Sequence, residues 1–223
     1  ETYTVAPAVH AAIETASATA RFDGNTLELW IAAQAPEMTR RAAGKAIGLS
    51  PQDVVLYPTA AGGSFDARLE RRHAIEVAQI AKEVGRPVQL TWPRVQEFQS
   101  VPVRTPVSAR MEAAFVPASG GRIAAWRARL AMPATAREFG RRLFDNKTAE
   151  AAMKHSEGKA DVLACEGAVP PYAIDNVAID HLPVSLPFPT GRLRGNAPAY
   201  TAFFTECFID ELAERAGRAP FLY

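Results

Sequence analysis

A glycine-rich segment in the first third of the chain has the residue types that bind an anion. It reads Gly62-Gly63-Ser64-Phe65-Asp66 and follows an apolar run at 54–57 that is typical of a buried strand. Glycine lets the backbone approach a ligand closely, and N–H groups between a strand and a helix can face negative charge. The segment lacks both the Gly-Lys-Ser/Thr ending of a P-loop and the G-x-G-x-x-G spacing. The residues therefore predict either an anion-binding loop or a tight turn that binds nothing.

Gln34 occupies a comparable place after its own predicted strand, Leu27–Ile31. Ligands of open α/β sheets collect beyond the carboxyl ends of the strands. If the two strands are parallel neighbours, Gln34 and the glycine segment share one crevice, where an amide can both donate to and accept from a polar ligand. The alternative is that Gln34 caps the helix predicted to begin at Pro36.

A third candidate is the segment that precedes the last predicted helix. Arg192 and Arg194 alternate there with Gly191 and Gly195, shortly before Pro198. Guanidinium groups near a helix N-terminus can hold an anion. Solvent-exposed arginines on a surface loop are the alternative.

The cysteines carry weaker signals. Cys165 and Cys207 are far apart and form no C-x-x-C motif, so neither an iron–sulfur cluster nor a cysteine zinc site is encoded. A cysteine hydrolase that pairs one of them with His155 or His181 has no supporting spacing. Cys207 falls in an apolar helical pattern and is expected to be a small buried hydrophobe.

Composition limits the class of protein. The 223 residues include 25 basic and 24 acidic side chains, which gives a net charge of +1 and no basic excess for nucleic acid. No apolar run approaches the roughly 18 residues of a membrane span. The chain begins at Glu1 without a start methionine and stops at Tyr223 without a closing element. We expect a single domain over 1–223, a fragment of a larger subunit, with lobes at 1–100 and 101–223 as a further division.

Local patterns predict the elements that position these residues. A hairpin is expected over 15–31 and helices over 36–48, 69–84 and 199–216, with further strands over 54–57 and 88–92. The alternation of strands and helices indicates an α+β fold, a mixed β-sheet with βαβ units and packed helices. A second hairpin, 111–130, is expected to continue this sheet, and the charged stretch 138–154 to form a surface helix or excursion.

Five blocks of the chain resemble, in the same order, the first molybdopterin-binding domain of molybdenum hydroxylase large subunits. These are the xanthine dehydrogenase and aldehyde oxidase family, and the bacterial isoquinoline 1-oxidoreductase beta subunits and related aldehyde dehydrogenases are most similar. The blocks are His10–Ala20 (H-x-x-M/I-E-x-x-x-A-x-A), Trp30–Pro36 (W-x-x-T-Q-x-P), Gly62–Glu70 (G-G-G-F-G-R-R-L-E), 84–94 (V-G-R-P-V and W-x-R) and Arg194–Ala213 (R-G/S followed by A-F-x-x-E-S-F-I-D-E-L-A).

The resemblance implies a cofactor and its contacts. Gln34 matches the glutamine beside the oxo group of molybdenum, and the backbone around Phe65 (Gly63, Ser64 and Asp66) matches the loop at the metal and dithiolene end. Arg194 matches an arginine near the molybdenum pocket. The pterin dithiolene holds the metal, so no protein metal ligands are expected. The implied cofactor is molybdopterin, with the cytosine dinucleotide as one form.

Departures from the family pattern bear on substrate and activity. Asp66 and Ser64 stand where the family has glycine, and a carboxylate beside an anionic cofactor repels it. Leu69 and Asn196 occupy substrate-pocket positions where purine-oxidising members have a glutamate and an aromatic ring, so purines are not expected. The family's catalytic glutamate lies in a later domain, and Glu206 is interpreted as structural. We therefore expect no catalytic residue in this chain and no turnover by the chain alone.

These residues lead to two hypotheses. The first is a cofactor domain of an oxidoreductase for aldehydes or N-heterocycles, with the remaining large-subunit domain and an iron–sulfur small subunit as partners. The second is a truncated or degenerate non-catalytic domain that retains the fold for assembly. The compartment stays open between bacterial cytoplasm and periplasm.

Overall fold

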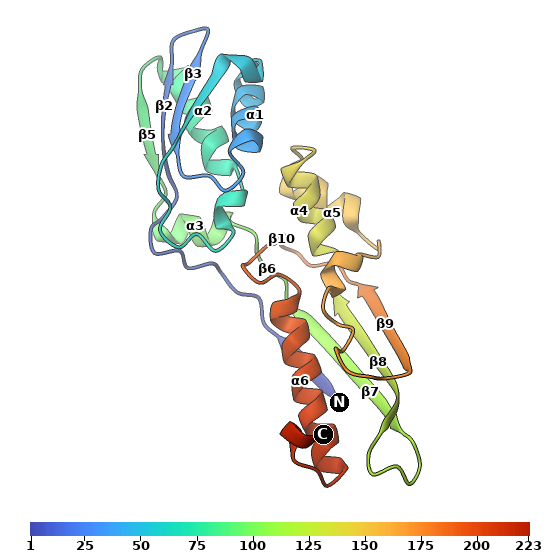
Figure 1. The fold of residues 1–223 in the computed structure, drawn as a ribbon. Helices are drawn as coiled ribbons and strands as arrows, with labels where there is room; N and C mark the ends of the chain where they lie inside the picture. The colour runs from blue at the N-terminus through green and yellow to red at the C-terminus, as the bar shows by residue number, and fades with distance from the viewer. The chain divides into compact units, whose positions relative to one another are not determined.

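A computed structural model describes residues 1–223 as two compact units. The ribbon in Figure 1 gives the order of the elements along the chain. The first unit comprises Glu1–Ala8, Arg104–Phe139 and Ala149–Tyr223, and the second comprises Val9–Val103 and Gly140–Thr148. Each unit is thus formed by segments that lie far apart in the sequence.

The second unit is built on a four-stranded mixed sheet in the order β4-β3-β2-β5. Its strands are β2 (Ser17–Phe22), β3 (Leu27–Ile31), β4 (Val54–Pro58) and β5 (Val88–Thr91), and its helices are α1 (Pro36–Ile47), α2 (Arg72–Val84) and α3 (Arg94–Ser100). The β2–β3 hairpin is antiparallel and β3 pairs with β4 in parallel, so β3-α1-β4 is the predicted βαβ unit.

The core of this unit explains why these segments form these elements. Alternate residues of β3 are buried, as the period of a strand requires, and α1 and α2 contribute small and branched side chains at helical spacing. Pro36 occupies the first turn of α1, and Gly48 ends the helix with a φ of 83°. The buried residues are Ala18, Ala20, Leu27, Leu29, Ile31, Ala43, Ile47, Val54, Ala74, Val77, Ala78 and Ala81.

The first unit has its own four-stranded sheet, in the order β1-β7-β8-β9. Its strands are β1 (Thr2–Val5), β7 (Val107–Phe115), β8 (Ile123–Met132) and β9 (Asn176–Pro183); β9 pairs with β8 in parallel and the other pairs are antiparallel. The long helix α6 (Pro198–Arg215) packs on one face, where Phe208 meets Trp126 with ring centroids 5.0 Å apart. Two further strands, β6 (Val103–Arg104) and β10 (Thr190–Gly191), are two residues long.

Three expectations about these elements were wrong. The β7–β8 hairpin does not continue the sheet of β2 to β5, because β7 takes β1 as its other neighbour. The charged stretch is two helices, α4 (Thr135–Leu143) and α5 (Ala149–Ser156), and α4 buries Phe139 and Leu143, which recur at helical spacing. The predicted helix 69–84 begins at Arg72, since a short 3-10 helix, Ala67–Leu69, precedes it.

Candidate functional site

The parallel pairing of β3 and β4 brings Gln34 to the glycine loop, Gly62–Asp66. Both strands end at the same edge of the sheet, with Ile31 opposite Pro58. Gln34 donates from Nε2 to Oδ1 of Asp66 at 3.1 Å and accepts at Oε1 from the hydroxyl of Ser64 at 3.0 Å. The shared edge was predicted from the sequence, and the alternative role as a cap is wrong, because α1 has no side-chain cap.

The loop has an unusual backbone. Gly63, Phe65 and Asp66 all lie in the left-handed region, with φ of 63°, 49° and 76°. This region costs a non-glycine residue about 1 kcal/mol or more, and such residues cluster at functional sites. Ser64 and Asp66 therefore do not prevent the loop from forming, and the side-chain hydrogen bonds to Gln34 offset part of the cost.

The space around Gly63 is also tight. A Cβ atom on Gly63 would lie 3.2 Å from the ring of Phe65 and 3.5 Å from Ile13. A side chain there must adopt positive φ, and the exposed ring of Phe65 must shift by a few tenths of an ångström. The glycine is thus fixed by the local shape of the loop.

The loop N–H groups divide into two kinds. The amide of Gly62 donates to the carboxylate of Glu14 at 2.7 Å, so it is not the open donor that the glycine pair predicted. The amides of Gly63, Ser64 and Phe65 make no hydrogen bond within the chain. The loop leads into a 3-10 helix rather than directly into α2, so the donors that it offers to an anion are these amides and not the end of an α-helix.

A buried ion pair supports the loop, and sequence reasoning missed it. Arg68 and Glu97 are almost fully buried and lie 3.0 Å apart. Arg68 also donates to the backbone carbonyl of Glu14, at 3.1 Å, while Glu97 accepts from the amide of Ala16 and from Arg94. No spacing rule connects Arg68 with Glu97; the only signal was two charged residues next to apolar neighbours.

The remaining predicted site residues are placed as follows. Leu69 closes the 3-10 helix after the loop and is half-buried. Arg194 and Asn196 belong to the first unit, in the segment before α6. Arg194 is exposed and makes no hydrogen bond or ion pair within the chain, whereas the side-chain oxygen of Asn196 is buried without a hydrogen-bond partner.

The cysteine hydrolase reading finds no support in the geometry. Both cysteines are half-buried free thiols, and burial raises the pKa of Cys165 to about 11, so this thiol stays protonated at neutral pH. The ring of His181 is held by the amide of Asp161 and the carbonyl of Met132. The structure contains no group of three or more His, Cys, Asp or Glu side chains arranged to hold a metal ion.

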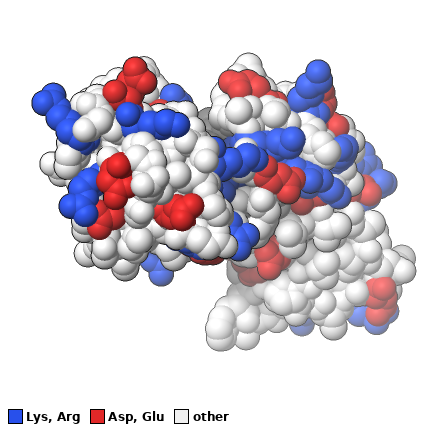
Figure 2. Space-filling view, turned by 90° about the horizontal axis from the view of Figure 1, so that it is seen from above, with Lys and Arg blue, Asp and Glu red and all other residues white.

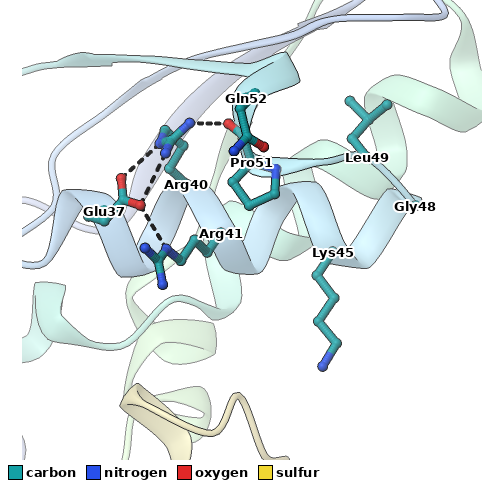
Figure 3. A pocket seen from close by; sticks show the side chains of 8 residues that line it. All are labelled: Glu37, Arg40, Arg41, Lys45, Gly48, Leu49, Pro51 and Gln52. Atoms are coloured by element: carbon teal, nitrogen blue, oxygen red, sulfur yellow. Dashed lines mark hydrogen bonds and ion pairs between the residues drawn. The ribbon is translucent and has the colours of Figure 1, made fainter.

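A hollow of the same unit, about 480 Å³ in volume, lies along α1 and the turn that follows it (Figure 3). Arg40 and Arg41 both donate to Glu37, and Arg40 also reaches the carbonyl of Pro51, while Lys45 points away from them. The two arginines hold the pKa of Glu37 down to about 2. This cluster ties α1 to the start of β4 and does not include any predicted site residue.

Comparison with known proteins assigns the chain. Residues 1–222 match the family model described as the molybdopterin cofactor-binding domain. The isoquinoline 1-oxidoreductase subunit beta of Brevundimonas diminuta is 26% identical over 198 residues, which are 89% of this chain and 24% of that protein. The membrane-bound aldehyde dehydrogenase [pyrroloquinoline-quinone] of Gluconacetobacter polyoxogenes is 28% identical over 226 residues, 98% of this chain and 28% of that protein.

A solved structure has the same fold. The aldehyde oxidoreductase of Desulfovibrio gigas superposes with a TM-score of 0.77 at 23% sequence identity, over 99% of this chain and 22% of its own. The chain thus spans about a quarter of the length of the relatives it matches. The fold, the order of the motifs and the match over nearly every residue agree, and the chain belongs to the molybdopterin cofactor-binding domain family.

Proposed function

We propose that the glycine loop and Gln34 hold the metal end of the molybdopterin, and that the whole protein oxidises an aldehyde or an N-heterocycle. The observation that carries the proposal is the row of three loop amides, Gly63, Ser64 and Phe65, that have no acceptor within the chain. Adjacent backbone amides of this kind bind anions. They lie beside the amide of Gln34, which adds a side-chain donor.

The residues fit the anionic cofactor with one exception. The open amides and the tight space at Gly63 suit a ligand that contacts the backbone. The family resemblance adds Arg194, an exposed cation, as a further contact of the cofactor. The carboxylate of Asp66 opposes an anion. It accepts a hydrogen bond from Gln34, so part of its charge is taken up within the chain.

The bound cofactor supplies redox chemistry at its metal, and this chain supplies the contacts. The residues of this chain donate hydrogen bonds and shape the loop; no acid or base of the reaction is proposed among them. We further propose that the remaining large-subunit polypeptide and an iron–sulfur small subunit complete the enzyme. The name of one relative, a subunit beta, and the share of each relative that the chain covers favour this arrangement.

Two glycine variants test the loop in the full-length protein produced together with its neighbouring subunits. Gly63→Ala and Gly24→Ala both place a side chain at positive φ, 63° and 104°, but a Cβ on Gly24 meets nothing within 4 Å. We expect Gly63→Ala to lower the bound molybdenum and pterin at least tenfold, and Gly24→Ala to leave both unchanged. Metal is measured by mass spectrometry and pterin by fluorescence after extraction.

The same assay distinguishes the proposed function from a degenerate domain that binds no cofactor. If the wild-type assembly contains neither molybdenum nor pterin, the domain is degenerate and the proposed function is wrong. If the wild type is loaded and Gly63→Ala is loaded equally, the cofactor binds elsewhere and the loop assignment fails.

A further inference from the structure

The side-chain amide of Gln34 is engaged at both ends by the loop that faces it. Its nitrogen lies 3.1 Å from Oδ1 of Asp66, and its oxygen lies 3.0 Å from the hydroxyl of Ser64. Gln34 itself is exposed, so packing does not hold its side chain. The orientation of the amide therefore depends on these two partners.

The chemistry of the partners allows only one orientation. An ionised carboxylate can only accept, so the NH2 group must face Asp66. The hydroxyl of Ser64 can then donate to the amide oxygen. Turning the amide over would bring its oxygen against the carboxylate and lose the hydrogen bond to Asp66, while the hydroxyl of Ser64 could still accept from the NH2 group.

The partners are themselves fixed by the backbone. The amide of Ala67 donates to the carbonyl of Ser64 at 2.8 Å, and the amide of Leu69 donates to the carbonyl of Asp66 at 3.1 Å. The backbone amide of Gln34 donates to the carbonyl of Arg68 at 3.0 Å, which ties the end of β3 to the same short segment. Gln34 and the segment that carries Ser64 and Asp66 are thus joined by a backbone hydrogen bond as well as by side-chain hydrogen bonds.

We propose that Ser64 and Asp66, the two departures from the family's glycines, are positioning residues that lock the amide of Gln34. One of its two N–H bonds is given to Asp66, and the second is kept as a donor for an oxygen atom of the ligand. Locking replaces a freely turning amide, which presents oxygen as often as nitrogen, with one that presents a donor. The orientation stands on this chain alone; only its use toward the cofactor rests on the proposed function.

Two substitutions of Asp66 separate the hydrogen bond from the charge. Asp66→Asn keeps an oxygen that accepts from Gln34 and removes the charge, and asparagine tolerates the φ of 76°. Asp66→Gly removes both the accepting oxygen and the charge. Glycine suits that backbone conformation better than any other residue, so the variant is expected to fold. Ser64→Ala removes only the hydroxyl.

The test is the order parameter of the Gln34 side-chain amide in the 223-residue chain, measured by 15N relaxation without cofactor. We expect a value near about 0.85, typical of a rigid group, in the wild type and in Asp66→Asn. In Asp66→Gly it should fall below about 0.6, and in Ser64→Ala it should fall part of the way. The signal is assigned by its loss in Gln34→Leu, and the exposed Gln89 serves as the mobile reference.

A mobile Gln34 amide in the wild type, or an equally rigid one in Asp66→Gly, would overturn the proposal. Because the measurement needs no metal, its failure is separate from that of the proposed function. Cofactor content of the loaded assembly provides the second readout. If charge alone mattered, Asp66→Asn and Asp66→Gly would change occupancy equally; positioning requires that Asp66→Asn be loaded more fully than Asp66→Gly.

Discussion

At the scale of single residues, His73 is a buried titratable group of the second unit with a strongly shifted pKa. It lies on α2, is 3% exposed and meets Trp92 edge-on with centroids 5.8 Å apart. Burial, with a smaller contribution from the nearby Arg68, lowers the pKa of His73 to about 4. The imidazole is therefore neutral in the folded protein throughout the range in which an unfolded chain takes up a proton.

This difference predicts a pH-dependent loss of stability. Between pH 6.5 and 4 the unfolded chain binds a proton at His73 that the folded chain does not, so stability rises with pH in this window. From pH 7 to pH 5 the free energy of unfolding should fall by about 2 kcal/mol through this group. Urea unfolding of His73→Leu should lack that component.

Glu37→Gln is the matched control. The pKa of Glu37 is lowered from 4.5 to about 2, so from pH 5 to 7 this carboxylate is mainly ionised in both the unfolded and the folded chain. Its replacement should leave the pH dependence of the free energy of unfolding between pH 5 and 7 as in the wild type. An unchanged slope in His73→Leu would show that other groups carry the pH dependence.

At the scale of elements, the Arg68–Glu97 pair joins α3 to the 3-10 helix behind the glycine loop. Removing one partner leaves a buried uncompensated charge, which costs about 3–5 kcal/mol. We expect Glu97→Leu to destabilise the chain by that amount in urea unfolding. Arg68→Met combined with Glu97→Leu should cost less than the single change, because no charge is then stranded.

The position of the pair adds a local consequence. Arg68 holds the carbonyl of Glu14, whose carboxylate holds the amide of Gly62. Relative to the wild type, Glu97→Leu should speed the deuterium exchange of the Gly62 amide more than that of the Gly24 amide, which lies in the distant hairpin turn. Equal changes at both glycines would mean that the ion pair stabilises the unit without supporting the loop.

The elements also show how far the sequence leads. The β2–β3 hairpin, α1 with its terminal Gly48, and the parallel β3–β4 pair were predictable because short-range periodicity and turn residues define them. The start of α2 was placed too early, since Leu69 fits the apolar period while the loop backbone still requires extended geometry at Glu70. The separate sheet of the first unit was missed because β1 and β7 pair across more than a hundred residues.

The candidate site also has a part that the sequence predicted and a part that it did not. The meeting of Gln34 with the glycine loop followed from strand order, which the sequence indicates. The hydrogen bonds of Gln34 to Ser64 and Asp66, and the use of Glu14 by Gly62, depend on side-chain directions that no pattern encodes. Ser64 and Asp66 were singled out as departures from the family's glycines, with the carboxylate expected to repel an anionic cofactor, and the structure shows both hydrogen-bonded to Gln34.

At the scale of the whole molecule, basic and acidic side chains nearly balance in number. Basic and acidic side chains are interspersed over the face shown in Figure 2, in keeping with 25 basic and 24 acidic residues. None of the helices combines the length and the apolar character that crossing a bilayer requires. The proposed recognition of an anion therefore rests on the specific contacts of the glycine loop and not on a field of one sign.

The presence of two separate cores predicts two cooperative units. Leu29 is fully buried in the core of the second unit and Phe204 in that of the first. Leu29→Ala should cost about 2–5 kcal/mol and Phe204→Ala about 3–5 kcal/mol, each through the cavity left behind. Hydrogen exchange read by mass spectrometry should show lost protection in 17–91 for Leu29→Ala, and in β7, β8 and α6 for Phe204→Ala. If either variant loosens both sets of segments equally, the chain unfolds as one domain, because the free energy of each core is then shared by the whole.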